Sequence, residues 1–418
     1  MTHTETLPSG LRLLTESMPH VRSVSVGVWL KRGSRHESDA ESGVAHFVEH
    51  MLFKGTERRT AQQIAQTIDS IGGQLDAFTA KEYAGYYIKV LDEHLPLAID
   101  LLADMVMRPA LQPEDVEREQ GVILEEIKMV EDVPDDLVHE VFVQQFWNRH
   151  PLGRPILGTP ETVMSFTSDR LRAYFERTYL APNLVIAAAG HVDHDRLRDL
   201  VARAFADLPA MTDGAVAVPP EVEPGFVVRE KDLEQSHICL GTPAYPSAHE
   251  ERHAMFVLNT ILGGSMSSRL FQHIREERGL AYAVWSSLIS YSDAGALTIY
   301  AGCSTDRVRE VIDLTLAELA ALRSTPVDAA ELQRAKEHLK GSLMLSLEST
   351  SSRMSQLARQ ELTFGRQFSL DEILGGIEAV TADDILRVSQ DLFRDGAAVA
   401  TVVGPAMDGD LTLDHLRI

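Results

Sequence analysis

Two histidines and a glutamate in the segment His46-Phe-Val-Glu-His50 have the types and spacing needed to bind a metal ion. In a helix, His46 and His50 lie four residues apart and project from the same face, so both imidazoles can bind one ion. Glu49 lies three residues after His46, close enough to reach a metal-bound water without being a ligand. The segment therefore predicts a metal site with a carboxylate beside it. The alternative is a pair of surface histidines on a solvated helix face.

A catalytic zinc ion needs a third protein ligand and an open position for water. The acidic segment 114–133 offers candidates for that ligand. Glu119 and Glu126 are seven residues apart, two helical turns, and therefore share one face, whereas Glu125 points about 100° away. A glutamate-rich helix always contains such pairs, so this segment by itself is more typical of a solvated helix face.

The histidines need a helix to position them, and the segment from Gly43 to Gly55 is predicted to form one. Ser42 is a suitable N-cap residue, and apolar residues recur along the segment. Gly55 is a suitable residue for ending the helix. An alternating strand at 23–30 precedes it, which places the metal helix directly after a strand.

The chain is predicted to contain two similar halves separated by a linker rich in proline and small residues. Each half is expected to open with an alternating strand, from Ser23 and from Ser236, that is followed by a helix, and each ends on a short apolar strand that finishes in glycine. The offset of roughly 210 residues indicates a duplicated domain rather than a solenoid repeat. We therefore predict an α+β fold of two homologous domains, each a largely antiparallel sheet with helices packed on it. The boundaries are 1–210 for the catalytic zinc-binding domain, 211–225 for the linker and 226–418 for the non-metal domain.

Composition narrows the class of protein and its partners. The chain has 418 residues, 62 of them acidic and 39 basic, for a net charge of −23, which argues against a nucleic-acid partner and favours basic or neutral ones. Cys239 and Cys303 lie in apolar stretches and are expected to be buried thiols rather than a disulfide. The N-terminus has no secretory signal, and no stretch approaches the about 18 apolar residues of a membrane helix. We expect a cytoplasmic protein with no membrane partner.

Five segments in chain order resemble those of one peptidase family. They are GVAHFVEHMLFKGT, GGQLDAFTAKEYAGYY, EEIKMVEDVPDD, HPLGRPILGT and LGGSMSSRLFQHIREERGLAYAV. The family is that of the pitrilysin-type zinc peptidases, whose H-x-x-E-H motif reverses the order of ordinary zincins. The resemblance is strongest to their bacterial branch, which is similar to the mitochondrial processing peptidase. It covers essentially the whole chain and is therefore far more specific than a five-residue motif.

The resemblance implies a role for each residue of the predicted metal site. His46, His50 and Glu126 match the ligands of one Zn²⁺ per chain, Glu49 matches the general base, and Glu119 matches a supporting glutamate. Zinc lowers the pKa of its bound water toward about 7 and polarises the peptide carbonyl. Glu49 would take the proton of that water and pass it to the leaving amine. Sites with two histidines and a glutamate also accept other divalent ions.

The resemblance also implies substrate contacts. Arg275 and Tyr282 match a family pair that holds the substrate, and Tyr282 is expected to donate to the developing oxyanion. Asp136 and Glu140 lie where relatives bind an arginine of the substrate, although such a pair is also typical of a solvated helix face. An edge strand is expected to pair with the substrate as an added strand. Its residues are Leu75, Asp76, Ala77, Phe78, Thr79 and Ala80.

The resemblance further implies how the enzyme is assembled. The chain has two of the four domains that larger relatives use to enclose a chamber, so we expect a homodimer. The second half carries Phe256, Asn259 and Thr260 in place of the ligands and base, and is therefore not expected to bind metal. In that arrangement Arg275 and Tyr282 would act in the site of the other subunit. The expected function is a zinc metalloendopeptidase that cleaves unfolded or short, basic peptides inside the chamber.

Two alternatives remain open from the sequence. The chain could be a non-catalytic or partner-dependent subunit of a processing-peptidase-like heterodimer, but it retains the whole catalytic set. It could also be a metal hydrolase acting on something other than peptides, against which the edge strand and the Arg275–Tyr282 pair argue.

Overall fold

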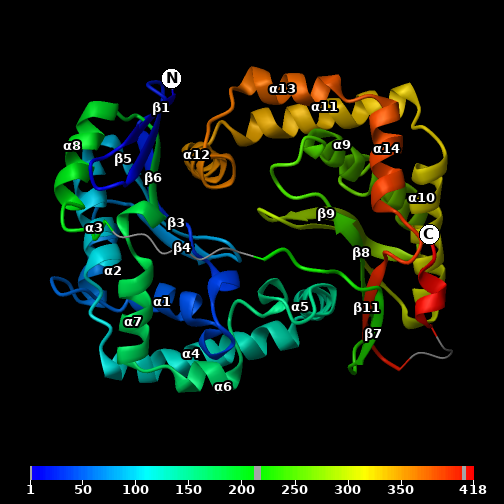
Figure 1. Cartoon of the computed structure of the whole chain (residues 1–418), viewed down its shortest axis with the longest axis horizontal. Coiled ribbons are helices and arrows are strands. Elements are labelled where there is room, and N and C mark those ends of the chain that lie inside the picture. Colours follow the sequence, from blue (N-terminus) through cyan, green and yellow to red (C-terminus); the bar gives the residue numbers. More distant parts are fainter. Residues whose placement is uncertain (1, 211–217, 407–410) are drawn as a thin grey trace. The chain divides into compact units, whose positions relative to one another are not determined.

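In a computed structural model, residues 2–210, 218–406 and 411–418 are described, and they form two compact units (Figure 1). Unit 1 comprises the described residues of Met1–Lys128, Arg154–Ala217 and Ser346–Gln367. Unit 2 comprises those of Met129–Gly153, Val218–Leu345 and Phe368–Ile418. Each unit therefore takes one segment from the other half of the chain. The boundary at 211–225 stays a prediction, and residues 211–217 of that linker lie outside the described residues.

Unit 1 is built on a six-stranded sheet with the strand order β1-β2-β6-β3-β5-β4. Only β2 and β6 pair in parallel, and every other pair of neighbours is antiparallel. The central strands are apolar on both faces because both faces are covered by helices. The strands are β1 (Thr2–Thr6), β2 (Arg12–Ser17), β3 (Ser23–Leu30), β4 (Gln74–Thr79), β5 (Ala84–Leu91) and β6 (Leu184–Gly190).

The helices of unit 1 enclose two separate cores. The larger core lies against one face of the sheet and contains the apolar side of α1, including Phe47, Val48 and Met51. The smaller core lies on the other face, where Met354 and Leu357 of α12 pack on strands β2, β3 and β6. The helices are α1 (Val44–Leu52), α2 (Ala61–Asp69), α3 (Leu95–Met107), α4 (Pro113–Asp132), α6 (Pro160–Ser165), α7 (Ser168–Thr178), α8 (His194–Ala204) and α12 (Thr350–Phe364).

Unit 2 repeats this sheet without the outermost strand β1. Its order is β7-β11-β8-β10-β9, again with one parallel pair, here between β7 and β11. Helix α5 packs on β11 and β8. The strands are β7 (Gly225–Glu230), β8 (Ser236–Ala244), β9 (Ala281–Ser290), β10 (Gly295–Cys303) and β11 (Val399–Gly404). The helices are α5 (Pro134–Phe146), α9 (Arg252–Leu262), α10 (Val308–Ser324), α11 (Ala329–Ser346), α13 (Leu370–Ala379) and α14 (Ala382–Leu392).

The repeated sheets confirm the predicted α+β class, and the differences from the prediction are local. Two strands, β1 and β2, precede the strand at 23–30 with which the first half was expected to open. Both cysteines are buried thiols, as expected. Across the described parts of the chain, no helix combines the length and apolar character that crossing a membrane requires.

Candidate metal centre

Helix α1 turns its apolar residues to the core of unit 1 and keeps His46, Glu49 and His50 on its less buried side. The ligand atoms of His46, His50 and Glu126 all lie within 4.8 Å of one another. Glu126 Oε2 lies 3.7 Å from His46 Nε2 and 3.5 Å from His50 Nε2. Within the described residues, no other group of histidines, cysteines and acids meets this distance criterion.

Helix α4 supplies both glutamates because its 20 residues present one face over several turns. Glu126 meets the two histidines, and Glu119, two turns earlier, meets His50 from the same face. Glu125 instead lies on the exposed side, where its carboxylate pairs with Lys128 Nζ at 2.6 Å. The structure therefore brings together the four histidines and glutamates that the sequence pointed to, and it excludes Glu125.

The two histidines differ in how their second nitrogen is held. His50 Nδ1 lies 2.9 Å from Glu119 Oε2, and the other oxygen of Glu119 accepts from Lys54 Nζ at 2.7 Å. A proton on Nδ1 donated to this carboxylate leaves His50 Nε2 free to bind metal. His46 Nδ1 is buried and has no hydrogen-bond partner in the described part of the chain. Only one of the two ligands is thus oriented by a neighbouring side chain.

Burial shifts the pKa of two groups at this centre. It lowers the pKa of His46 to about 3, with a further contribution from His50, so the imidazole is neutral and able to bind metal. Burial also raises the pKa of Glu49, against the opposing effect of a hydrogen bond from Thr79 Oγ1 to Glu49 Oε2 at 2.5 Å. A raised pKa makes Glu49 a stronger base than an exposed glutamate.

The N-terminus of α1 is capped by a residue that lies six positions before its N-cap residue. The carboxylate of Glu37 accepts hydrogen bonds from the backbone nitrogens of Gly43 and Ala45, each at 2.8 Å. Ser42 was predicted to be the N-cap, and this prediction was wrong. The N-cap position is Gly43, whose φ of +92° favours glycine, and the buried Oγ of Ser42 makes no hydrogen bond to a described residue. Because Glu37 is deeply buried, its pKa is raised to about 7.

The predicted substrate-pairing run lies on strand β4 and the residue that follows it. β4 pairs with β5 and forms one edge of the sheet, so in the described part of the chain its other side has no strand partner. The hydroxyl of Thr79, near the end of this strand, is the group that contacts Glu49. The edge strand and the base are therefore in direct contact.

The remaining predicted residues all belong to unit 2. Arg275 lies in a single π-helical turn (Phe271–Glu276), and its guanidinium lies 4.8 Å from the centroid of the Tyr282 ring. Tyr282, at the start of β9, is 79% exposed, so its hydroxyl end is accessible. Asp136 and Glu140 both lie on α5, with Asp136 exposed and Glu140 partly buried.

Three contacts at the centre were not predicted from the sequence. Lys54 lies four residues after His50, a spacing that points to the same helix face, but nothing in the sequence shows that it meets Glu119. Thr79 was predicted to contact substrate through its backbone, whereas its side chain contacts the base. No sequence motif indicates that Glu37 caps the helix, because Glu37 lies in the preceding loop and not in a capping motif.

Comparison with known proteins assigns the family. The family model "Insulinase (Peptidase family M16)" matches residues 12–160, and "Peptidase M16 inactive domain" matches residues 165–339. The uncharacterized zinc protease YmxG of Bacillus subtilis is 43% identical over 397 residues, covering 95% of this chain and 97% of that protein. The uncharacterized zinc protease SCO5738 of Streptomyces coelicolor is 44% identical over 419 residues, covering 98% and 91%. The chain therefore belongs to peptidase family M16, the pitrilysin-like family.

Solved structures share the fold along the whole chain. A protease from Helicobacter pylori superposes with a TM-score of 0.91 at 22% identity, covering 97% of this chain and 99% of that one. A Pseudomonas fluorescens structure described as a peptidase M16 inactive domain gives 0.92 at 21% identity, covering 98% and 100%. The family predicted from the sequence is thus confirmed. The narrower resemblance to the processing-peptidase branch stays a prediction.

Proposed function

We propose that this protein is a zinc metalloendopeptidase that cleaves unfolded or short, basic peptides. The observation that carries the proposal is the convergence of His46, His50 and Glu126 on one point, with the partly buried carboxylate of Glu49 beside them. Membership of a peptidase family and the zinc-protease names of its relatives support the same reading.

The donor set fits zinc. Two imidazoles and one carboxylate are a common three-ligand set for a catalytic zinc ion, which keeps a further position open. His46 is held neutral by burial, and His50 has its Nδ1 occupied by Glu119, so both can offer Nε2. When bound, zinc acts as a Lewis acid toward the peptide carbonyl and acidifies water. The structure supports one such ion per chain.

Glu49 provides the proton transfer that peptide hydrolysis requires. As the oxygen of the attacking water bonds to the carbonyl carbon, Glu49 takes the proton that this water loses. When the carbon–nitrogen bond breaks, Glu49 returns that proton to the leaving amine, so the carboxylate is regenerated. The hydrogen bond from Thr79 occupies Oε2 and leaves Oε1 for the water. Thr79 thereby orients the base.

The edge of β4 explains why the substrate would be an extended chain. An unpaired strand edge offers backbone donors and acceptors that an unfolded peptide can satisfy as an added strand. Leu75 to Ala80 form this edge and end at the contact with Glu49, so a bound peptide would run toward the metal. The net charge of −23, together with Asp136 and Glu140, favours basic peptides.

The proposal includes a homodimer in which the two subunits enclose a chamber. Tyr282 is largely exposed and is held by Arg275, as expected of a group that acts on a substrate bound elsewhere than on its own strand. We propose that this pair serves the metal centre of the other subunit. Mixing Glu49→Gln chains with Tyr282→Phe chains tests whether the pair acts in the other subunit.

Zinc content and peptide cleavage, measured on the wild type and on Glu49→Gln, test the central proposal. The wild type should contain one zinc ion per chain and cleave an unstructured basic peptide. Glu49→Gln should retain zinc and lose at least about 10²-fold in kcat, because general-base catalysis typically contributes that much. Glu125→Gln, on the exposed side of α4, is the matched control and should behave as wild type.

Two results would count against the proposal in different ways. A wild type without zinc, whose cleavage is insensitive to chelators, would overturn it. A wild type that binds zinc but cleaves nothing by itself would favour the alternative of a partner-dependent subunit.

A further inference from the structure

Lys54 connects the loop after the metal helix to the supporting glutamate. Its Nζ lies 2.7 Å from Glu119 Oε1, whereas His50 Nδ1 lies 2.9 Å from Glu119 Oε2. Each oxygen of one carboxylate thus has its own partner. Among the residues that the structure describes, Lys54 is the one lysine or arginine paired with Glu119.

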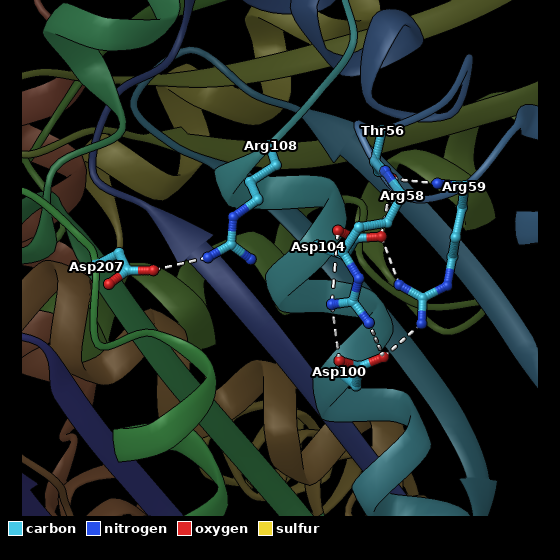
Figure 2. A network of polar contacts seen from close by, with 7 residues as sticks. All are labelled: Thr56, Arg58, Arg59, Asp100, Asp104, Arg108 and Asp207. Atoms are coloured by element: carbon cyan, nitrogen blue, oxygen red, sulfur yellow. Dashed lines mark hydrogen bonds and ion pairs between the residues drawn. The ribbon is translucent and has the colours of Figure 1, made fainter.

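The loop that carries Lys54 is anchored to helix α3 by a polar network (Figure 2). Thr56 Oγ1 donates to Asp104 Oδ2 at 2.8 Å and accepts from the backbone nitrogens of Arg58 and Arg59 at 3.0 and 2.9 Å. Asp104 is fully buried on α3, so this hydrogen bond is shielded from water. The turn after Lys54 is therefore stabilised by hydrogen bonds within itself and by one hydrogen bond to a buried residue of α3.

Two arginines complete the anchor. Arg59 Nη1 donates to Asp104 at 2.5 Å and its Nη2 pairs with Asp100 one turn away, while Arg58 Nη1 lies 3.1 Å from Asp100 (Figure 2). The carbonyl of Gly55 accepts from the backbone nitrogen of Ala110 at 3.0 Å, next to Lys54 itself. The backbone of Lys54 is consequently held on both sides, by the end of α1 and by this network.

Glu119 is buried, so its carboxylate needs partners that replace water, and Lys54 is one of them. Glu119 is only 4% exposed, and a carboxylate removed from water is costly unless charged or hydrogen-bonding partners replace the solvent. With Lys54 on one oxygen, the other oxygen faces His50 and accepts its Nδ1 proton. Without Lys54, one oxygen of this buried carboxylate would lose its charged partner, and holding the carboxylate in this orientation would cost more free energy.

We propose that Lys54 is a positioning residue for the metal centre: it holds Glu119 in the orientation that makes His50 present Nε2 to the ion. This inference rests on the proposed zinc function and deepens it. Lys54 pairs with Glu119, and among the described residues no ion pair joins it to a proposed ligand or to the base, so its effect is transmitted through Glu119.

The test is zinc affinity, measured by competition with a chromophoric chelator, for Lys54→Met and Lys54→Arg. Loss of an outer partner of a metal-binding histidine typically weakens metal binding by about 10- to 100-fold, and we expect this for Lys54→Met. Lys54→Arg keeps the charge and should recover most of the affinity. Lys128→Met removes a lysine–glutamate pair on the exposed side of α4 and should bind zinc as the wild type does.

A double-mutant cycle distinguishes positioning from a general loss of stability. If Lys54 acts through Glu119, Lys54→Met in a Glu119→Gln background should cause little further loss of zinc affinity. If Lys54→Met does not fold, as judged by circular dichroism, Lys54→Gln replaces it in the same cycle. Additive losses, or wild-type affinity in the single variant, would overturn the inference. A wild type that binds no zinc would instead overturn the proposed function.

Discussion

Helices α1 and α9 follow corresponding strands of two sheets that share the order of five strands, yet within the described residues only α1 carries the groups of a metal site. Each follows a central strand, β3 in unit 1 and β8 in unit 2. Where α1 has His46, Glu49 and His50, α9 has Phe256, Asn259 and Thr260.

The polar groups of α9 are satisfied within unit 2. Asn259 Oδ1 accepts from Ser286 Oγ at 2.8 Å, and Thr260 Oγ1 donates to the carbonyl of Phe256 at 2.9 Å. In α1, by contrast, Nε2 of both histidines points to Glu126, and His46 Nδ1 has no hydrogen bond to a described residue. The same scaffold therefore supports a structural helix or a metal helix, and the side chains decide which it is.

The largest expected effect comes from removing a ligand of α1. His50→Ala should lose zinc and lower kcat/KM by at least about 10³-fold, because both the metal and its activation of water are lost. Asn259→Ala, a change on the corresponding face of α9, is the control and should keep zinc and activity, while losing about 1 kcal/mol of stability from the broken hydrogen bond with Ser286. Metal analysis, kinetics and denaturant unfolding give these values. Loss of zinc in Asn259→Ala would contradict the claim that α1 binds the metal and α9 has only a structural role.

An intermediate effect is expected at the helix N-termini. In helix α9 the N-cap residue Glu251 makes no side-chain capping hydrogen bond, whereas α1 is capped by the buried Glu37, whose pKa rises from 4.5 to about 7 on folding. Because folding disfavours ionisation of Glu37, its contribution to stability is full below pH 4.5 and is lost as the pH rises through about 7. The difference amounts to about 3 kcal/mol.

Glu37→Gln removes this titration. The unfolding free energy of the wild type minus that of the variant should increase by about 3 kcal/mol between pH 8 and pH 4.5. The measurement uses metal-free protein in chelator, so that zinc binding does not add its own pH dependence. A difference that stays constant with pH would show that Glu37 titrates at an ordinary value.

The smallest effect tests whether residues of unit 2 complete a site in another subunit. Glu49→Gln and Tyr282→Phe chains are each expected to be impaired. After subunit exchange, half of the dimers are mixed, and each mixed dimer would contain one intact site, so activity should recover to about a quarter of the wild type. Mixing two preparations of the same variant is the control. Activity no higher than that of either variant by itself would exclude action in the other subunit.

Much of the metal centre could be predicted because it depends on the local geometry of helices. Residues one or two turns apart share a face in any α-helix. This applies to His46 and His50 on α1 and to Glu119 and Glu126 on α4. The strand at Ser23–Leu30 could likewise be predicted, because valines alternate with serine or glycine over its first six residues.

Other features had no local signal. The cap on α1 comes from Glu37 and not from the adjacent Ser42, because the chain turns so that a more distant carboxylate reaches the free backbone nitrogens. The sequence likewise did not indicate which helix packs on which sheet. Helix α12 packs on the first sheet and α5 on the second, although each belongs in sequence to the other half of the chain.

The sequence by itself determined which residues could bind a metal, their order on two helices and the repeated pattern of strands. Those properties follow from helix and strand periodicity, which acts over a few residues. Only the tertiary structure decided that α1 and α4 meet at that face, that Thr79 contacts Glu49, and that Lys54 and His50 share Glu119. These contacts join residues from 30 positions apart (Glu49 and Thr79) to 80 positions apart (His46 and Glu126), so they depend on how whole elements pack and bury their charges.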